Sequence, residues 1–284
     1  MSRLRLLTAV AAAFALAACN KPADSKQEAV TTTPPPPPAP QVITMTAHEY
    51  AYEGPDTISA GMTTFRLANT GTELHHMQLV RLNDGKTVQD LMAAPMEGPA
   101  PAWAIMVGGP NAAAPGDTAN ATLHVEPGRY AMLCFIPSSD GKPHVAKGML
   151  HQFEVIPSTA EAAAMPSPDV TITLADYAFN FSTPITAGRH TIKVENTASQ
   201  VHELVIIKLD AGKKAADFTS WAMTMKGPPP GRPMSGMGGL TPGQTAYVTD
   251  DFTPGSYAIV CFVPDVKDGK AHLAHGMVQD LTVS

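Results

Sequence analysis

The sequence predicts an all-β protein made of two tandem Greek-key β-sandwich domains, each with a short helix in an insert between its central strands. Three observations lead to this fold class. Short runs rich in Val, Ile, Leu, Thr and aromatic residues are separated by Gly, Pro and Asp-Gly punctuation. The whole series of runs occurs twice. Each copy occupies about 115 residues, which suits a sandwich or a small barrel.

The N-terminus has the pattern of an exported lipoprotein. Arg3 and Arg5 precede an apolar run that ends Leu16-Ala17-Ala18-Cys19, which predicts a secretory signal peptide over residues 1–19. The run is too short for a confident membrane span. The final four residues resemble a bacterial lipoprotein signal, in which the Cys is lipidated and becomes the new N-terminus. We expect Cys19 to be lipidated and to hold the protein on a bacterial membrane, facing the periplasm or the cell exterior; an ordinary signal peptide with a chance Cys is the alternative.

Residues 20–40 are predicted to be a disordered stalk. They are small and polar and then contain the proline tract Pro34–Pro38. Such a tract prefers extended polyproline II and acts as a semi-rigid spacer. A ligand for a proline-binding domain is the other interpretation of this segment.

Composition excludes some classes of function. The formal net charge is −6 and no cluster of Lys or Arg is present, so nucleic-acid binding is not expected. Of three cysteines, Cys19 is assigned to the anchor, which leaves Cys134 and Cys261. A small exported scaffold held together by disulfides would carry more.

An internal repeat divides the remainder of the chain. Shifting the sequence by 127 residues aligns Tyr50-Ala51-Tyr52 with Tyr177-Ala178-Phe179, and the shift becomes 128 near the end of each copy. We therefore predict one domain over residues 41–157, a linker over 158–168, and a second domain over 169–284. The expected strands are Val42–Thr46, Thr63–Ala68, Met77–Leu82, Ala119–Val125, Tyr130–Ile136, Gln152–Ile156, Val170–Leu174, His190–Glu195, His202–Leu209, Thr245–Thr249, Ser256–Val263 and Gln279–Val283. The expected helices are Thr87–Ala93 and Lys214–Trp221.

The repeat also sorts the ten histidines. Only two pairs of them recur at matching positions in the two copies, and each copy keeps the order His, Cys, His, Met. Two imidazoles, a thiolate and a weak thioether form the ligand set of a blue-copper site. The candidate metal ligands are His75, Cys134, His144 and Met149 in the first copy and His202, Cys261, His272 and Met277 in the second.

This order and its strand context resemble the cupredoxin family. In that family the first His follows an Asn-containing turn, as His75 follows Asn69 and His202 follows Asn196. The resemblance implies one type 1 copper per domain, single-electron transfer and redox protein partners. It covers nearly all of each copy.

Two departures from the family pattern leave alternatives open. Nine residues separate Cys134 from His144, and ten separate Cys261 from His272, more than in plastocyanin- and azurin-like members. His76 and Glu203 stand where many cupredoxins have an Asn that ties the ligand loops together. Each Cys or Met alone is also an ordinary core residue, so a metal-free binding or scaffold module is an alternative.

The sequence predicts that the protein is not an enzyme. Neither Cys has a flanking His, and the chain contains no His-x-His pair, no Gly-x-Ser-x-Gly motif and no phosphate-binding glycine loop.

A group of methionines suggests copper storage or delivery as a further alternative. Exposed thioethers suit Cu(I), although flexible Met side chains also fill gaps or form adaptable docking surfaces. These residues are Met92, Met96, Met106, Met223, Met225, Met234 and Met237.

Overall fold

The computed structural model describes residues 37–94, 100–224 and 226–284. The predicted signal peptide, Cys19 and the stalk up to residue 36 lie outside these ranges. Residues 37–40 form no helix or strand, and the Pro38 carbonyl accepts a hydrogen bond from Ala164 N–H at 3.0 Å. Within the described residues, no helix has both the length and the apolar character needed to cross a bilayer.

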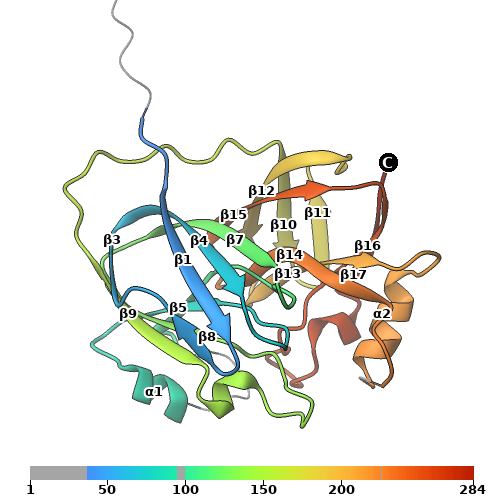
Figure 1. The fold of residues 1–284 in the computed structure, drawn as a ribbon, viewed down its shortest axis with the longest axis horizontal. Helices are drawn as coiled ribbons and strands as arrows, with labels where there is room; N and C mark the ends of the chain where they lie inside the picture. The colour runs from blue at the N-terminus through green and yellow to red at the C-terminus, as the bar shows by residue number, and fades with distance from the viewer. Residues whose placement is uncertain (1–36, 95–99, 225) are drawn as a thin grey trace, which may run out of the picture. The chain divides into compact units, whose positions relative to one another are not determined.

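Each half of the chain forms its own set of strands (Figure 1). The first half contains β1 (Gln41–His48), β2 (Ala51–Glu53), β3 (Thr57–Ser59), β4 (Gly61–Asn69), β5 (Gln78–Leu82), β6 (Ala104–Gly108), β7 (Thr118–Val125), β8 (Gly128–Leu133) and β9 (Leu150–Ile156). The second half contains β10 (Val170–Ala175), β11 (Ala178–Phe181), β12 (Gly188–Asn196), β13 (His202–Leu209), β14 (Gly231–Leu240), β15 (Thr245–Phe252), β16 (Gly255–Val260) and β17 (Val278–Val283).

Equivalent strands have the same order in the two halves. The eight-stranded sheet runs β11-β10-β12-β15-β7-β4-β1-β2, and the nine-stranded sheet runs β17-β16-β13-β14-β6-β5-β8-β9-β3. In both halves the first strand pairs in parallel with the long strand β4 or β12. The tandem all-β sandwich predicted from the sequence is therefore confirmed.

Alternating burial fixes which face of each strand points inward. In β10 the side chains of Val170, Ile172 and Leu174 are buried, whereas the residues between them are partly exposed. This period of two is what a strand with one core-facing side requires. The largest apolar cluster draws residues from both halves and includes Cys134 and Cys261.

The two halves join edge to edge in both sheets. Thr122 of β7 pairs with Tyr247 of β15, and Val107 of β6 pairs with Leu240 of β14. In the nine-stranded sheet, Gln78 holds the junction, because its Nε2 donates to Gly239 O at 3.0 Å and its Oε1 accepts from Gly239 N–H. The junction is thus built from main-chain pairing and buried side-chain hydrogen bonds.

All twelve predicted strands are present, and five further strands are found: β2, β3, β6, β11 and β14. Strand β14 is rich in Gly and contains Pro233, so its sequence resembles a turn region. It forms a strand because β13 pairs with one edge and β6 with the other. Two predicted strands were too long, since β8 ends at Leu133 and β16 ends at Val260, one residue before each Cys.

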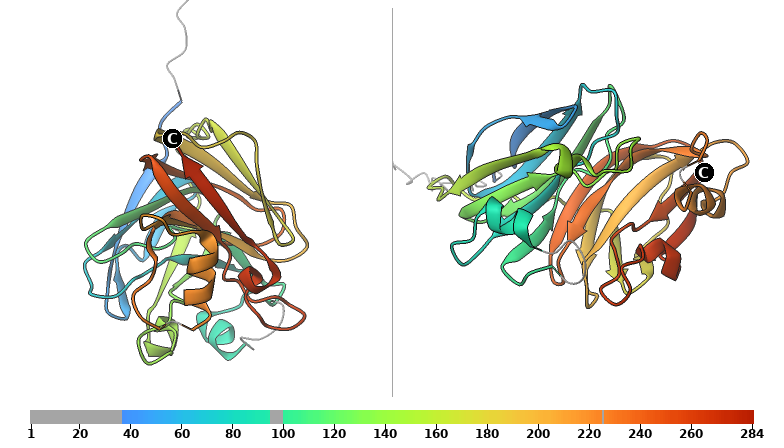
Figure 2. Two further views of the ribbon diagram at one scale, coloured as in Figure 1. Left: turned by 90° about the vertical axis from the view of Figure 1, so that its right-hand side faces the viewer. Right: turned by 90° about the horizontal axis from the view of Figure 1, so that it is seen from below.

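The predicted helices are confirmed within a residue or so. Helix α1 spans Val88–Ala93 and begins with a capping box between Thr87 and Asp90. Helix α2 spans Ala215–Ala222 and packs beside β16 and β17 (Figure 2). Residues 157–169 form no helix or strand; the domain boundaries around the predicted linker stay a prediction.

Candidate metal centres

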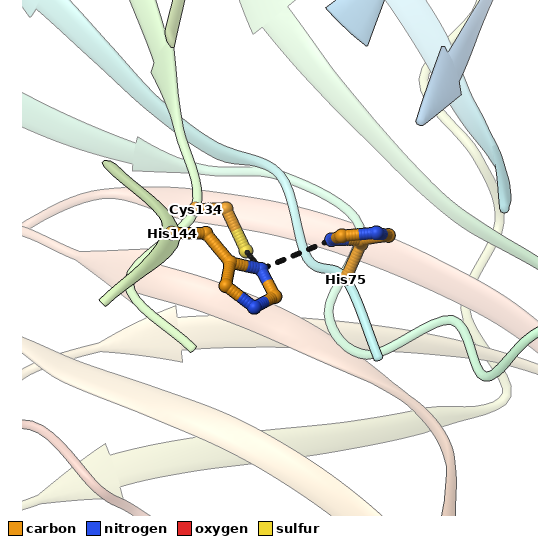
Figure 3. A group of neighbouring side chains, drawn as sticks. All are labelled: His75, Cys134 and His144. Carbon is orange, nitrogen blue, oxygen red and sulfur yellow. Dashed lines mark hydrogen bonds between the residues drawn. The ribbon is translucent and has the colours of Figure 1, made fainter. Parts of the chain in front are cut away.

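The first half brings three of its four predicted ligands into direct contact (Figure 3). His144 Nδ1 lies 3.1 Å from His75 Nδ1 and 3.4 Å from Cys134 Sγ. Cys134 directly follows β8, and His144 begins a short 3-10 helix, His144–Lys147. All three side chains are fully buried.

The second half repeats this arrangement. Cys261 Sγ lies 3.4 Å from His272 Nδ1 and 3.9 Å from His202 Nδ1. His272 begins the equivalent 3-10 helix, His272–His275, and all three side chains are again fully buried. In both halves the candidate ligand atoms lie within 4.8 Å of one another.

Met149 and Met277 stand directly before the last strand of each half and are fully buried. The main chain ties each to the other ligands. Met149 N–H donates to His144 O at 3.0 Å, and Met149 O accepts from Cys134 N–H at 3.4 Å. Met277 makes the same two bonds, to His272 O at 3.0 Å and from Cys261 N–H at 3.2 Å.

The long loop between Cys and the second His folds back on itself in both halves. His144 N–H donates to Ile136 O and Val145 N–H to Cys134 O, at 2.9 and 2.8 Å. His272 and Leu273 make the equivalent bonds, both at 2.9 Å. The extra residues therefore form a hairpin outside the ligand group, and they do not move the second His away from the Cys.

A buried Asn fixes the turn before each first ligand. Asn69 Nδ2 donates to Glu73 O and Ala113 O, both at 2.8 Å. Asn196 Nδ2 donates to Gln200 O at 2.8 Å and Leu240 O at 2.6 Å. Because each Asn bonds across the turn and to a segment beside it, Ala113 or the end of β14, the following His enters the core at a defined position.

Two glycines that the sequence analysis did not single out allow the backbone to approach the first ligand strand closely. A Cβ at Gly109 would lie 2.0 Å from Met77 O, and a Cβ at Gly236 would lie 2.1 Å from Leu204 O. Both glycines have positive φ, 128° and 148°, a region that other residues rarely adopt. They are 127 residues apart, so the internal repeat could have identified them.

Tyr50 and Tyr177 cover the second His of each centre. Their rings lie 5.2 Å from His144 and 5.5 Å from His272 between centroids. Both tyrosines have a left-handed backbone, with φ of 61° and 64°, which is unusual for an aromatic residue. The repeat aligned these two tyrosines, but their role required the three-dimensional contacts.

The residue after the first ligand supplies the support that the sequence left open. His76 Nε2 accepts the amide hydrogen of Phe135, and Glu203 Oε1 accepts that of Phe262, both at 2.9 Å. Phe135 and Phe262 directly follow the two cysteines. Although neither His76 nor Glu203 is the Asn of many cupredoxins, each ties the His strand to the Cys loop as that Asn does.

Burial sets the protonation of the donors. It lowers the pKa of His75 and of His272 to about 4, and it lowers the pKa of His202. Burial also raises the pKa of the Cys134 thiol to about 11 and that of Cys261 well above its usual range. At neutral pH the imidazoles of these three histidines are thus neutral, with a free lone pair, and a metal must displace the thiol proton.

The donor set fits one soft or borderline metal ion in each half. Ligands of one ion with bonds of about 2.0–2.3 Å lie about 3–4 Å apart. The contacts between donors here measure 3.1–3.9 Å, and all donors of a group lie within 4.8 Å of one another. The clustered atoms are imidazole nitrogens and a thiol sulfur, with no carboxylate. The predicted copper cofactor is confirmed to this extent: each half has a buried His/Cys/His group suited to it.

The methionines of the inserts are dispersed. Met237 is fully buried in the main core, whereas Met92 and Met223 are exposed. Met106 and Met234 lie in β6 and β14, at the junction of the halves, and Met96 and Met225 are outside the described residues. These positions favour packing for Met237 and leave Met92 and Met223 on the surface.

Comparisons with known proteins bear on the fold. Neither a protein-family profile nor a curated protein sequence matches the chain. Among solved structures, Na-dithionite-reduced auracyanin from the photosynthetic bacterium Roseiflexus castenholzii is 26% identical over 40% of this chain and 94% of its own, with a TM-score of 0.31. The Cu-containing nitrite reductase NirK from Thermus scotoductus SA-01 is 12% identical over 87% of this chain and 62% of its own, with a TM-score of 0.25. A blue copper oxidase from Nitrosomonas europaea is 13% identical over 86% of each chain, with a TM-score of 0.26.

Strand order and the two His/Cys/His groups define the class: this is a cupredoxin-like two-domain fold with a candidate metal centre in each half.

The prediction that the protein is not an enzyme is wrong. Structures that match most of this chain include a nitrite reductase and a copper oxidase, which are enzymes. The prediction rested on the residues that flank Cys134 and Cys261 and on missing motifs. Those features argue only against a second copper site linked to the thiolate through His residues beside the Cys. They do not exclude catalysis, because proteins that share one fold have many functions.

Proposed function

We propose that each half binds one type 1 copper ion and that the protein transfers single electrons. The ligands would be His75, Cys134, His144 and Met149 in the first half and His202, Cys261, His272 and Met277 in the second. The observation that supports this most directly is the pair of fully buried His/Cys/His groups, whose donor atoms lie within 4.8 Å of one another and whose hydrogen-bonded contacts measure 3.1–3.9 Å.

Bound copper would supply a one-electron change between Cu(I) and Cu(II). The chain's own residues would keep the rearrangement of the ligands that accompanies this change small. Glu73 and Asp176 hold the imidazoles of His144 and His202 through hydrogen bonds to Nε2, and the full burial of every donor excludes water. The amide of Glu203 lies 3.4 Å from Cys261 Sγ and donates to it. Hydrogen bonds of this kind to the sulfur are one means of tuning a reduction potential.

We place this activity at the outer face of a bacterial membrane. The lipoprotein-type signal ending at Cys19 supports a lipid anchor, and the proline tract supports a stalk that lets the two domains reach redox proteins at the membrane. Cys19→Ser is expected to move the protein from the membrane fraction to the soluble exported fraction. Unchanged membrane association of that variant would contradict the anchor.

The copper proposal is tested on the full chain carrying Cys19→Ser, which prevents acylation. Addition of Cu(II) should give an intense visible thiolate-to-copper band and two copper ions per chain. The double variant Cys134→Ser/Cys261→Ser should lose the band. His124→Ala is the matched control, because His124 is exposed and has no counterpart in the other half; it should keep the full band. Stoichiometric copper binding without the band, or no binding, would contradict the proposal.

A further inference from the structure

A further group of possible metal ligands lies beside the second centre. Asp265 and Asp268 belong to the loop between Cys261 and His272, and His275 ends the 3-10 helix that His272 begins. One donor atom from each of Asp265, Asp268 and His275 lies within 4.8 Å of the other two. None of these three side chains is a ligand in the copper proposal.

Hydrogen bonds hold the buried carboxylate of this group in place. Asp265 is only 2% exposed. Its Oδ2 accepts from the Tyr177 hydroxyl at 2.5 Å and from Gln200 Nε2 at 3.0 Å, and its Oδ1 accepts from Lys267 N–H at 2.8 Å. Because a carboxylate offers about four acceptor positions, these hydrogen bonds fix Asp265 and still leave a position for a metal ion.

The other two donors lie at the surface, where an ion can reach them. His275 Nε2 lies 3.1 Å from Asp268 Oδ1, and the two side chains are 30% and 35% exposed. The Lys270 ammonium lies 3.3 Å from Asp268 Oδ2, but the Lys270 side chain is 68% exposed. Such an exposed ion pair stabilises a protein little, so Lys270 can turn into the solvent when an ion binds.

A buried nitrogen without a partner faces this group. Among the described residues, His272 Nε2 has no hydrogen-bond partner, although the side chain is fully buried. It lies 3.7 Å from Asp265 Oδ2, which is too far for a hydrogen bond. In the first half the equivalent nitrogen, His144 Nε2, binds Glu73 at 2.7 Å. Buried polar atoms usually have a partner, so the missing one points to an ion or its water beside Asp265.

The first half holds a cation of the chain itself at the equivalent place. Lys147 is the counterpart of His275 in the repeat. Its Nζ lies 3.1 Å from Asp140 Oδ2 and 3.1 Å from the Tyr50 hydroxyl, and it stands over the Tyr50 ring. In this half an ammonium group therefore balances the carboxylate.

The second half lacks this ammonium and has an additional carboxylate. His275 replaces Lys147, and Asp265 replaces Ser138. The group thus changes from one ammonium and one carboxylate to one imidazole and two carboxylates. Two carboxylates this close repel each other unless a cation lies between them, and imidazole together with carboxylate suits zinc and related divalent ions.

We infer that Asp265, Asp268 and His275 bind one divalent cation, of the kind that prefers imidazole and carboxylate ligands, beside the second centre. Zinc is the ion that fits this donor set, since three protein ligands and a water molecule are a common zinc coordination. In the first half the Lys147 ammonium takes the place of such an ion. The inference does not depend on copper binding.

The test adds Zn²⁺ to the Cys19→Ser full chain that also carries Cys134→Ser and Cys261→Ser, which removes both buried thiols. Calorimetric titration gives the number of zinc ions and their affinity. The paired change Asp265→Ser/His275→Lys gives the second half the residues of the first. It is expected to fold, because the first half already accommodates these side chains, and to bind one zinc ion fewer per chain than the parent.

Two single variants remove one ligand each. Asp268→Asn and His275→Gln should each raise the dissociation constant of this zinc ion by about tenfold or more, since even the loss of an outer contact of a metal site typically costs that much. Asp140→Asn is the matched control, because Asp140 has the equivalent place in the first half and pairs with Lys147. It should leave the zinc affinity unchanged.

A second measurement locates the ion. The ring signals of His275 in an NMR spectrum, assigned by their absence in His275→Gln, should shift as zinc is added. The signals of His124, which is exposed and lies on β7 of the first half, should not. A group that only stabilises the loop would leave the His275 signals independent of zinc.

The inference is overturned if the parent binds no zinc, or if Asp265→Ser/His275→Lys binds as many zinc ions as the parent. It is also overturned if Asp140→Asn weakens binding as much as Asp268→Asn does, or if saturating zinc leaves the His275 signals unchanged. Because no copper is used, failure of this test leaves the proposed function standing, and failure of the copper test leaves the zinc site standing.

Discussion

The two centres share four predicted ligands and differ in what surrounds them. The Tyr52 hydroxyl donates a hydrogen bond to His76 O, whereas the equivalent residue in the second half is Phe179, which has no hydroxyl. A buried imidazole, His76, supports the first Cys loop, and a buried carboxylate, Glu203, supports the second.

Carboxylates also contact the ligands differently in the two halves. Glu73 binds Nε2 of the second His, His144, at 2.7 Å. In the other half Asp176 binds Nε2 of the first His, His202, at 3.0 Å, and Asp265 lies farther from Nε2 of the second His, His272, at 3.7 Å. This difference indicates that both copies kept the same ligand residues after the duplication, whereas the residues that contact those ligands changed. Because such contacts tune metal sites, we expect the two centres to have different spectra and reduction potentials.

Removing one thiol should have the largest effect. Cys134→Ser or Cys261→Ser is expected to abolish one centre completely and to lower the copper count from two per chain to one, because no other soft donor replaces the thiolate. The two single-centre proteins should then show bands at different energies. Superimposable spectra and equal reduction potentials would contradict the expected difference between the two centres.

Alanine at the two close-approach glycines should strongly destabilise the protein. Gly109→Ala and Gly236→Ala each place a Cβ about 2 Å from a carbonyl oxygen, so each should lower the free energy of unfolding by about 2–5 kcal/mol.

Gly116→Ala is the control for these variants. Gly116 also has a positive φ, 81°, but a Cβ there meets nothing within 4 Å, so only the backbone cost of about 1–2 kcal/mol applies. Denaturant unfolding measures all three. A loss at Gly109 or Gly236 no greater than at Gly116 would contradict the close approach.

The metal-free protein should lose stability as the pH falls from about 6.5 to 4. Burial lowers the pKa of His75 and His272 to about 4, so in this range the unfolded chain binds more protons than the folded chain, and acid favours unfolding. Glu203 acts in the opposite direction, because burial raises its pKa to about 7. Its contribution to stability is present at low pH and is lost as the pH rises towards 7.

The melting temperature of the metal-free protein between pH 4 and 7 measures this balance. His75→Gln should flatten the acid-side decline, because it removes one buried imidazole. Glu203→Gln should steepen it, because it removes the opposing group. A decline that neither variant changes would show that these residues do not control the pH dependence.

The smallest effect is expected at Tyr52. Tyr52→Phe removes a buried hydroxyl that donates to His76 O, in the residue directly after the ligand His75, at a cost of about 1 kcal/mol of stability. It should shift the band of the first centre only. Phe179→Tyr is the reciprocal change and should affect only the second. An equal shift of both bands by either variant would show that the difference between the centres does not depend on this hydroxyl.

Much of the fold and the candidate site could be predicted because the chain contains two copies of one unit, which can be compared with each other. Residues kept at an offset of 127 or 128 identified the strands, the two domains and the order His, Cys, His, Met. Apolar alternation with Gly and Pro punctuation then located twelve strands. The additional strands β6 and β14 were missed, since β14 is rich in Gly and contains Pro233, and each becomes a strand by pairing with its neighbour, β6 with β5 and β14 with β13, and with the other across the junction.

The sequence by itself determined the all-β class, the duplication and the eight candidate ligands, because side-chain type and spacing carry that information locally. The tertiary structure decided whether the long loop returns His144 to Cys134, and His272 to Cys261. It also decided which outer residues touch each centre. Those outcomes depend on hydrogen bonds between segments far apart in the chain, such as Asn111 to Glu203, and no local pattern encodes a contact between two halves that pack edge to edge.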